Sequence, residues 1–490
     1  MMLHVEKRRN VNSKRDPASW VGGHRGQVFC RVFTLILLVC FVDPERGGAW
    51  TVFGDKLVGR GPLAESDYSL FGRTLSPSLD LNGTARLNYI GGRIDAENSF
   101  IFAPQLNLDM NLQLTARDRI HALFRPFDHG VSGPPGRPSR ATQWRAKRGR
   151  GQRNSTAHKL DFEPDRIWFE IEPFTWLSPE DRVPLDILVA GGRIPLVFHN
   201  QYWMNEDVLG FAVSKNNVYV PALSNLNVIM FGAFEEMNRF QDAQVAGIGA
   251  FIDYKGYFVE GTFAYAFDKS IRNDRFFAGV SVTKQFVLTG FALRVLLNED
   301  DGVQKGPDLG ALFVVESETP IFLDESLGGA GRLYVNTFYG TRNYAPLGAG
   351  NVGRQGFLFR PDRSVQVPTL LPRGTDSGGG AVGFVFNAEG DVTVTPEIGF
   401  VRDERRRSRT GRRTAGNLEQ IGLGLRVQGN LANFLIPGST FPWFAADFSK
   451  IVERLEAGLY GLQLRSTWYN IIPTAGQTQH ALRIELLYDF

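Results

Sequence analysis

The sequence predicts an all-β fold, a single transmembrane antiparallel β-barrel of about 16–18 strands around a water-filled lumen. Three observations predict it. Apolar and polar residues alternate with a period of two in many segments, and the connections between these segments are very unequal in length. The chain is rich in glycine, with 54 residues, and 12% of it is aromatic. Its mean hydropathy of -0.16 argues against a bundle of transmembrane helices.

The clearest strand signal lies where Leu106, Leu108 and Met110 alternate with polar neighbours. In a strand, this pattern places apolar side chains on one face and polar ones on the other. Comparable segments recur at roughly the 9 to 11 residues that a transmembrane strand needs. The expected strands span residues 84–94, 104–116, 118–126, 166–175, 184–194, 225–236, 243–254, 256–268, 275–285, 286–297, 308–317, 330–340, 379–387, 391–402, 418–428, 441–449, 454–469 and 479–490.

Residues 1–49 read as a secretory signal peptide with a long basic lead. An apolar run from Val32 to Val42 follows several Lys and Arg residues and precedes the small-residue triplet Gly47-Gly48-Ala49, so cleavage is expected before Trp50. The alternative interpretation is a buried core segment. Both cysteines of the chain lie in this segment, so the mature protein is expected to contain neither a disulfide nor a Cys-ligated metal.

Residues 50–83 form a short periplasmic segment in this interpretation, and residues 84–490 form the barrel. The N-terminal segment is too short for the plug of an energy-coupled transporter, which needs on the order of a whole domain. Long connections are expected near residues 127–160, 341–378 and 402–417, with tight turns near 387–391 and 253–256. One strand after residue 402 is inconsistent in parity, and Asn430 to Ile436 is the leading suspect.

The last strand carries the most specific signal. Its apolar residues alternate with mostly polar ones up to a terminal aromatic residue, namely Leu482, Ile484, Leu486, Tyr488 and Phe490. This pattern resembles the final strand of bacterial outer-membrane β-barrel proteins of the porin type. The resemblance implies a location in the bacterial outer membrane, contact with its lipid and lipopolysaccharide, and recognition of the last strand by the barrel-assembly machinery.

A barrel of this size encloses an aqueous channel, because wall side chains cannot fill its interior. Strand parity places charges of both signs toward the lumen. Facing rows of acids and bases would orient polar solutes by a transverse field, although a solvated charge without a specific role is the simpler interpretation for each residue. The pore-lining candidates are Arg166, Glu170, Glu172, Glu260, Arg294, Arg426, Arg483 and Glu485.

Two identical tetrapeptides, Gly91-Gly92-Arg93-Ile94 and Gly191-Gly192-Arg193-Ile194, each end an expected strand. Glycine there permits a bulge or a close turn. Arg93 and Arg193 would then reach either the pore or lipid phosphates, or have only a structural role. The element is similar to one at strand ends in alginate-export and related specific-channel porins. The match covers four residues, and no solute site is carried over from it.

Two basic stretches, Arg137–Lys159 and Arg402–Arg413, fall between expected strands. They are interpreted as solvated outer loops, with inward folding of the first and a narrower pore as the alternative. Nucleic-acid binding is not supported, because aromatic residues are not interleaved with these charges except Trp144.

No catalytic, cofactor-binding or metal-binding residue is proposed. The seven histidines show no metal-ligand spacing, and no G-x-S-x-G, P-loop or H-E-x-x-H motif occurs. The expected function is passive diffusion of small polar solutes, anions included. The alternative is a structural or adhesive barrel with a blocked lumen, which would follow if Arg137–Lys159 or the 341–378 loop packed inside. The solute, its selectivity and a homo-oligomeric state are left open.

Overall fold

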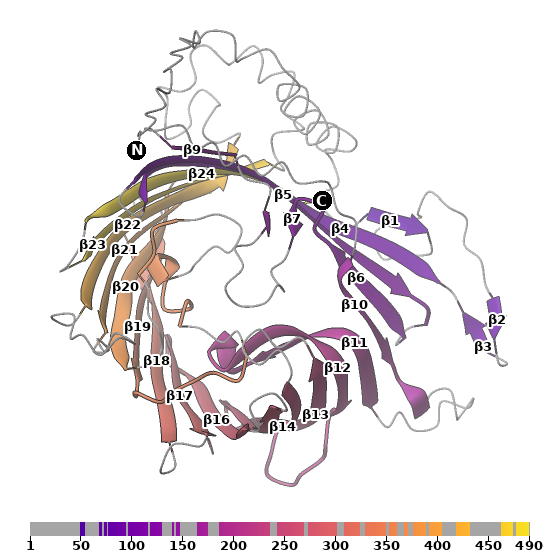
Figure 1. Ribbon diagram of the computed structural model, residues 1–490. Helices are drawn as coiled ribbons and strands as arrows, with labels where there is room; N and C mark the ends of the chain where they lie inside the picture. Colours follow the sequence, from indigo (N-terminus) through magenta and orange to yellow (C-terminus); the bar gives the residue numbers. More distant parts are fainter. Residues whose placement is uncertain are drawn as a thin grey trace, which may run out of the picture.

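Eighteen antiparallel strands close into one barrel in the computed structural model (Figure 1). The structure describes residues 50–53, 68–70, 73–75, 77–94, 97–115, 118–129, 140–141, 144–147, 164–174, 186–235, 243–268, 273–300, 308–323, 329–348, 352–359, 367–370, 376–388, 392–403, 418–431, 462–473 and 477–489. None of the helices found there is long and apolar enough to cross a membrane.

The wall strands follow chain order around the barrel, each paired with the next. They are β4 (Ser78–Ile94), β5 (Glu97–Gln113), β6 (Arg119–Phe124), β10 (Pro164–Ile171), β11 (Ile187–Phe198), β12 (Met204–Lys215), β13 (Asn225–Glu235), β14 (Ala243–Tyr254), β15 (Tyr257–Asp268), β16 (Asn273–Phe286), β17 (Thr289–Asp300), β18 (Asp308–Phe322), β19 (Ala330–Gly340), β20 (Ser377–Ala388), β21 (Val392–Asp403), β22 (Leu418–Asn430), β23 (Leu462–Pro473) and β24 (Gln479–Asp489).

Six short strands lie outside this order. Strand β1 extends the sheet along β4, and β9 pairs with the first half of β5, while β2 pairs with β3 and β7 with β8. They are β1 (Trp50–Phe53), β2 (Tyr68–Leu70), β3 (Arg73–Leu75), β7 (Asp128–His129), β8 (Arg140–Ala141) and β9 (Trp144–Lys147).

Strand β24 closes the barrel on β4. The two strands pair from His480 opposite Arg93 to Asp489 opposite Thr84. The Thr84 hydroxyl donates to the Asp489 carboxylate at 2.8 Å. A closed sheet satisfies every backbone group of the wall without leaving a free edge in hydrocarbon, which is why strands can span a membrane only as a barrel.

The strand order corrects the expected strands in two places. Strand β12 was not expected. Strand β22 pairs directly with β23, so three wall strands follow β21 where four were expected, and this one excess strand accounts for the parity problem. Residues 441–449 lie outside the described residues. The remaining suspect, Asn430, is the last residue of β22, whereas residues 432–436 lie outside the described residues.

Alternation separates an apolar outer face from an inner one, as expected. On β15, Phe263 is 48% exposed and faces outward, whereas Glu260 and Thr262 are buried on the inside. The outer face carries many more exposed Phe, Leu, Val and Ile side chains around the wall. Because long connections on outer-membrane barrels lie outside the cell, the end bearing the turns 254–257 and 286–289 is periplasmic.

Two segments between wall strands lie inside the barrel rather than beyond its rim (Figure 1). The first, here the inner turn, is residues 198–204 between β11 and β12 and contains the 3-10 helix η1 (His199–Gln201). The second, here the inner loop, is the described part of residues 341–370 and contains η3 (Phe357–Phe359). Tyr202, Trp203, Leu347 and Leu358 from these segments are fully buried in the largest apolar cluster of the described residues.

Candidate functional site: a constriction inside the barrel

One carboxylate of the wall holds the inner loop in place. Glu397 of β21 accepts the backbone N–H groups of Phe357 and Leu358, each at 2.8 Å, and the hydroxyl of Tyr334 on β19. Glu397 is only 4% exposed, and charge-assisted bonds of this kind are stronger than neutral ones. The contact therefore fixes η3 near the middle of the wall strands.

Glycines on the inner face of β21 and β22 make room for the loop. A Cβ atom on Gly424 would lie 2.5 Å from the Phe357 ring, and one on Gly399 would lie 2.5 Å from a Leu370 methyl group. Real Cβ atoms essentially never approach so closely, so these positions exclude any larger residue unless the loop moves. The apolar side chains of the loop thus pack directly on the backbone of the wall.

A buried histidine holds the inner turn. The backbone N–H of His199 donates to the Glu260 carboxylate at 2.7 Å, and its ring nitrogens lie 2.7 Å from the Ser281 hydroxyl and 2.6 Å from the Thr262 hydroxyl. A Cβ on Gly279 would collide with the ring. Burial, with a smaller contribution from the Arg294 charge, lowers the pKa of His199 to about 3. The imidazole is therefore neutral at physiological pH.

This burial predicts that the barrel loses stability in mild acid. Because the pKa of His199 is lower in the folded than in the unfolded chain, the unfolded chain takes up a proton as the pH falls below about 6.5, and the folded chain does not. The loss continues toward pH 3 and amounts to about 3 kcal/mol at pH 4.5. A thermal unfolding series from pH 7.5 to 4.5 checks this. The slope should be shallower in His199→Gln, and equal slopes in the two proteins would contradict the prediction.

The inner turn and the inner loop are bonded to each other. The N–H of Leu347 donates to the carbonyl of Trp203 at 3.0 Å, the Gln355 amide donates to the Tyr202 hydroxyl at 3.1 Å, and the Tyr344 hydroxyl donates to the Tyr202 carbonyl at 3.3 Å. Two segments that are far apart in the sequence thus form one structural unit within the lumen.

A buried ion pair on the intervening strands also anchors this unit to the wall. Arg294 of β17 donates to Glu316 of β18 through two guanidinium nitrogens, at 2.8 and 2.7 Å. The same carboxylate accepts the Asn200 amide at 3.0 Å and the Tyr202 hydroxyl at 2.9 Å. Burial and the Glu316 charge raise the pKa of Tyr202, so its hydroxyl keeps its proton and remains a donor.

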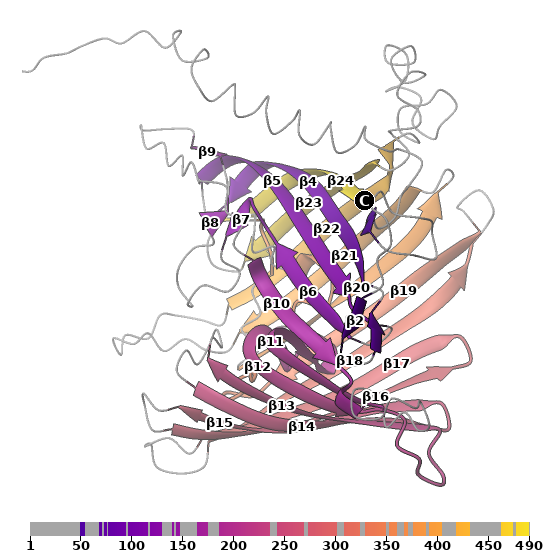
Figure 2. The ribbon, with the colours of Figure 1, turned by 90° about the vertical axis from the view of Figure 1, so that its right-hand side faces the viewer.

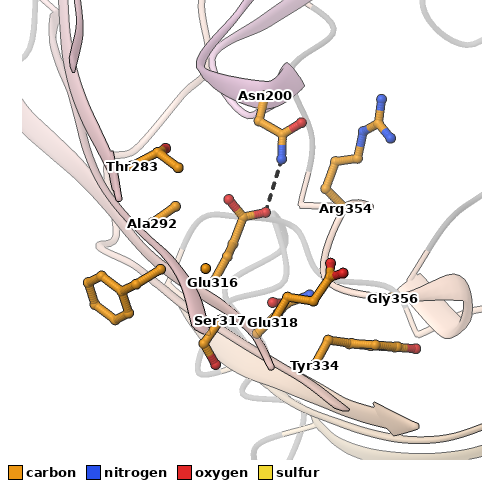
Figure 3. A pocket seen from close by; sticks show the side chains of 12 residues that line it. Asn200, Thr283, Ala292, Glu316, Ser317, Glu318, Tyr334, Arg354 and Gly356 are labelled. Atoms are coloured by element: carbon orange, nitrogen blue, oxygen red, sulfur yellow. Dashed lines mark hydrogen bonds between the residues drawn. The ribbon is translucent and has the colours of Figure 1, made fainter. Parts of the chain in front are cut away.

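A cavity of about 420 Å³ lies between the inner turn, the inner loop and strands β16–β19 (Figure 3). Figure 3 shows Asn200 bonded to Glu316 on one side of it and Arg354 of the inner loop on the other. A volume of this size accommodates a small molecule. The lining combines apolar and polar groups and holds charges of both signs: Asn200, Thr283, Gly290, Phe291, Ala292, Glu316, Ser317, Glu318, Tyr334, Asn336, Arg354 and Gly356.

Arginines gather on the inner face where β22, β23, β24 and β4 adjoin, and they form what is here called the arginine cluster. Arg465 lies close enough to Arg426, Arg86 and Arg483 to be repelled by their charges. Three of these arginines share the acid Glu485, which lies 2.8 Å from Arg483 and 3.8 Å from both Arg86 and Arg465. The guanidinium of Arg426 stacks 4.5 Å from the Phe357 ring, so the cluster borders the inner loop.

The structure brings five of the eight pore-lining candidates into these two groups. Arg426, Arg483 and Glu485 belong to the arginine cluster, Arg294 anchors the inner turn, and Glu260 accepts from His199. The other three lie apart from them. Arg166 pairs with Asp207 at 2.7 Å, Glu170 lies 3.5 Å from His121, and Glu172, 3% exposed, donates its backbone N–H to Asp118.

The two glycine–arginine elements differ in position, which corrects one expectation. Gly91–Ile94 does end β4, and Arg93 donates to the side chain of Gln477. Gly191–Ile194 lies within β11, which continues to Phe198. Gly192 has a φ of 117° and a Cβ there would lie 2.5 Å from the Ile167 carbonyl, so the glycine permits a local irregularity within the strand. The side chain of Arg193 also has an interaction partner.

Sequence reasoning missed the residues that build the constriction, namely His199, Tyr202, Trp203, Glu316 and Glu397. Tyr202 and Trp203 are fully buried inside the barrel. One signal was available. In β22, Gly422 and Gly424 alternate with outward Leu423 and Leu425, and a lumen-facing strand surface of glycine indicates a close contact from inside.

Of the expected assembly residues, Leu482 is 42% exposed on the outer face, and Ile484, Leu486 and Tyr488 share its strand parity. Phe490 and residues 1–49 lie outside the described residues, as do most of the two basic stretches. Within the described part of the chain, no group of three or more His, Cys, Asp or Glu side chains could hold a metal ion.

Solved structures with a similar fold include outer-membrane porins. OccK2 (OpdF) of Pseudomonas aeruginosa matches with a TM-score of 0.51 at 10% identity, over 84% of this chain and 97% of that one. Its complex with glucuronate gives 0.49 at 9% identity over 84% and 98%, and a BenF-like porin of Pseudomonas fluorescens Pf-5 gives 0.49 at 10% identity over 84% and 98%. No protein-family model matches the sequence, and no curated protein matches it either.

The chain is thus a transmembrane β-barrel with the fold of porin-type outer-membrane proteins, as the resemblance of its last strand implied. A closed wall of strands with an apolar outer face is the architecture of proteins in the bacterial outer membrane. At 10% identity the likeness concerns the fold, and the function has to be argued from the lumen.

Proposed function

We propose that the protein is a passive channel for small polar solutes that favours anions and has its narrowest part at the inner turn and inner loop. The observation that carries this proposal is the arginine cluster, in which three guanidinium groups share the carboxylate of Glu485 and a fourth, that of Arg426, lies beside them. Such an excess of positive charge attracts anions and repels cations in a water-filled lumen.

The test is the reversal potential of the purified chain in a planar bilayer under a salt gradient. We expect anion selectivity in the unmodified protein and a shift toward cations in the triple variant Arg86→Gln, Arg426→Gln, Arg465→Gln. The three removed charges should change the permeability ratio by roughly tenfold. Arg402→Gln is the matched control, because Arg402 lies at the end of β21 and pairs with Glu419 away from the cluster. Cation selectivity of the unmodified protein would refute the anion preference.

A barrel closed by its own loop is the second candidate, favoured by the packing of the inner loop against the wall. In that case the protein would be structural or adhesive, with binding by its outer loops. The same bilayer recording distinguishes the two candidates. Stable ionic steps support the channel, whereas silence at high protein load supports the closed barrel.

From the fold we also infer how the protein is exported and assembled and which lipids it contacts. The outward residues of β24, ending at Phe490, would be the signal for the barrel-assembly machinery, and residues 1–49 would be removed on export. The lipid-facing wall would contact phospholipid and lipopolysaccharide. The alternation of more and less exposed side chains from His480 to Leu487 on β24 supports the first of these inferences.

A further inference from the structure

Two lysines project from the periplasmic end of adjacent strands onto the outer face of the wall. Lys284 of β16 lies directly opposite Tyr257 of β15, and its ammonium group is 3.4 Å from the centre of that ring. Lys255, in the turn that joins β14 to β15, lies 5.1 Å from the centre of the Tyr254 ring. Figure 2 shows these strands side by side at the bottom of the barrel.

Both lysines are oriented toward lipid rather than toward an acid of the protein. Lys284 shares its face of β16 with Val280 and Phe286, which are 51% and 50% exposed. Among the described residues, the contacts of the Lys255 and Lys284 ammonium groups are with aromatic rings, and no carboxylate lies within ion-pair distance of either. Lys255 and Lys284 are therefore two positive charges at the edge of the apolar wall that form no ion pair with a described acidic residue.

The neighbouring turn carries apolar residues, which are unusual in a turn that is exposed to water. Phe286 pairs with Thr289, so Val287 and Leu288 form a two-residue turn, a position that favours Asn-Gly. Val287 is a β-branched residue with a φ of 53°, and its side chain is 95% exposed. The comparable turn at Lys255-Gly256 has the expected polar residue and glycine, with φ values of 48° and 76°. The apolar tip is thus strained and lacks contacts that would offset the strain.

We propose that this sector binds an anionic phospholipid of the periplasmic leaflet, with its phosphate between Lys255 and Lys284 and its acyl chain against Phe286 and Leu288. Basic side chains at a membrane surface attract anionic head groups, and lysine and tyrosine place their polar ends at that depth. A second copy of this chain would present the same two positive charges, so the charge pattern favours lipid. The proposal is independent of what passes through the lumen.

Retention of lipid by the purified, detergent-solubilised full chain tests the site. The protein is equilibrated with mixed micelles containing phosphatidylglycerol or phosphatidylcholine, and bound lipid is counted by native mass spectrometry. We expect preferential retention of phosphatidylglycerol, reduced about thirtyfold in Lys255→Gln, Lys284→Gln. Lys215→Gln is the matched control, because Lys215 ends β12 at the same end of the barrel. Equal retention of the two lipids, or an unchanged double variant, would overturn the proposal.

A second variant separates binding from folding. Val287→Asn, Leu288→Gly supplies the residues that a two-residue turn favours, so the barrel should be at least as stable to heat as the unmodified chain. Its phosphatidylglycerol retention should nevertheless fall, because the acyl chain loses its contact. Unchanged retention would overturn the role of the tip. Displacement of the lipid by millimolar inorganic phosphate would show a site for free phosphate and overturn the assignment to a phospholipid.

Discussion

Replacing residues 345–370 by a short Gly-Ser linker is expected to raise the single-channel conductance by roughly threefold, because conductance grows with the open cross-section. The inner loop occupies the lumen near the middle of the wall, tied to Glu397 and to the inner turn. Removing it leaves the strand pairs β18–β19 and β20–β21 intact, since these pairs do not depend on it. Conductance in a planar bilayer is the measurement.

The control shortens the connection between β21 and β22 at residues 404–417, which lies at the same end of the barrel. It should leave the conductance of the open channel unchanged. If the linker variant conducts no better than the unmodified protein, the inner loop does not form the constriction. If the unmodified protein is silent and the variant conducts, the loop closes the lumen and the second candidate function holds.

Glu316→Ala is expected to have the largest effect on stability. The substitution removes the acceptor of Arg294, Asn200 and Tyr202 and leaves the arginine charge buried at 8% exposure. Breaking one partner of a buried ion pair costs about 3–5 kcal/mol. The measurement is the midpoint of thermal unfolding in detergent, followed by circular dichroism and by the gel mobility of the folded barrel.

Glu318→Ala is the control on the same strand. Glu318 pairs with Arg332 at 2.9 Å, but the two side chains are 54% and 60% exposed, so its loss should cost about 1 kcal/mol or less. Replacing both members of the buried pair, as Arg294→Met, Glu316→Met, should recover much of the lost stability. A Glu316→Ala variant as stable as Glu318→Ala would show that the inner turn is held mainly by its apolar contacts.

Local alternation was sufficient to predict the wall, because a strand between lipid and water repeats every two residues. It failed at β12. Met204, Val208 and Ala212 face inward there and are buried by other parts of the lumen, so both faces of the strand are apolar and the period is obscured. The same reasoning also gave one wall strand too many after β21, because β22 pairs directly with β23.

The constriction could not be predicted by parity alone. Parity says which way Arg294 or Glu260 points, but the partners of these residues come from segments without periodicity. Nothing in the local sequence of His199 distinguishes a tip exposed to water from one folded inward. The signal that these segments fold inward lies in the strands that they contact, where Gly279, Gly399 and Gly424 leave room for them.

Closure of β24 on β4 joins parts of the chain that are nearly 400 positions apart, as in the bond from Arg483 to Asn88 at a separation of 395 residues. One edge of the first hairpin therefore remains unpaired until the last segment of the chain is present and can pair with it. During that interval two complementary edges are open to other chains. A protein shortened by its final ten residues would keep nearly all of its strands. It would still be prone to aggregate, because β4 would have no partner to close the barrel.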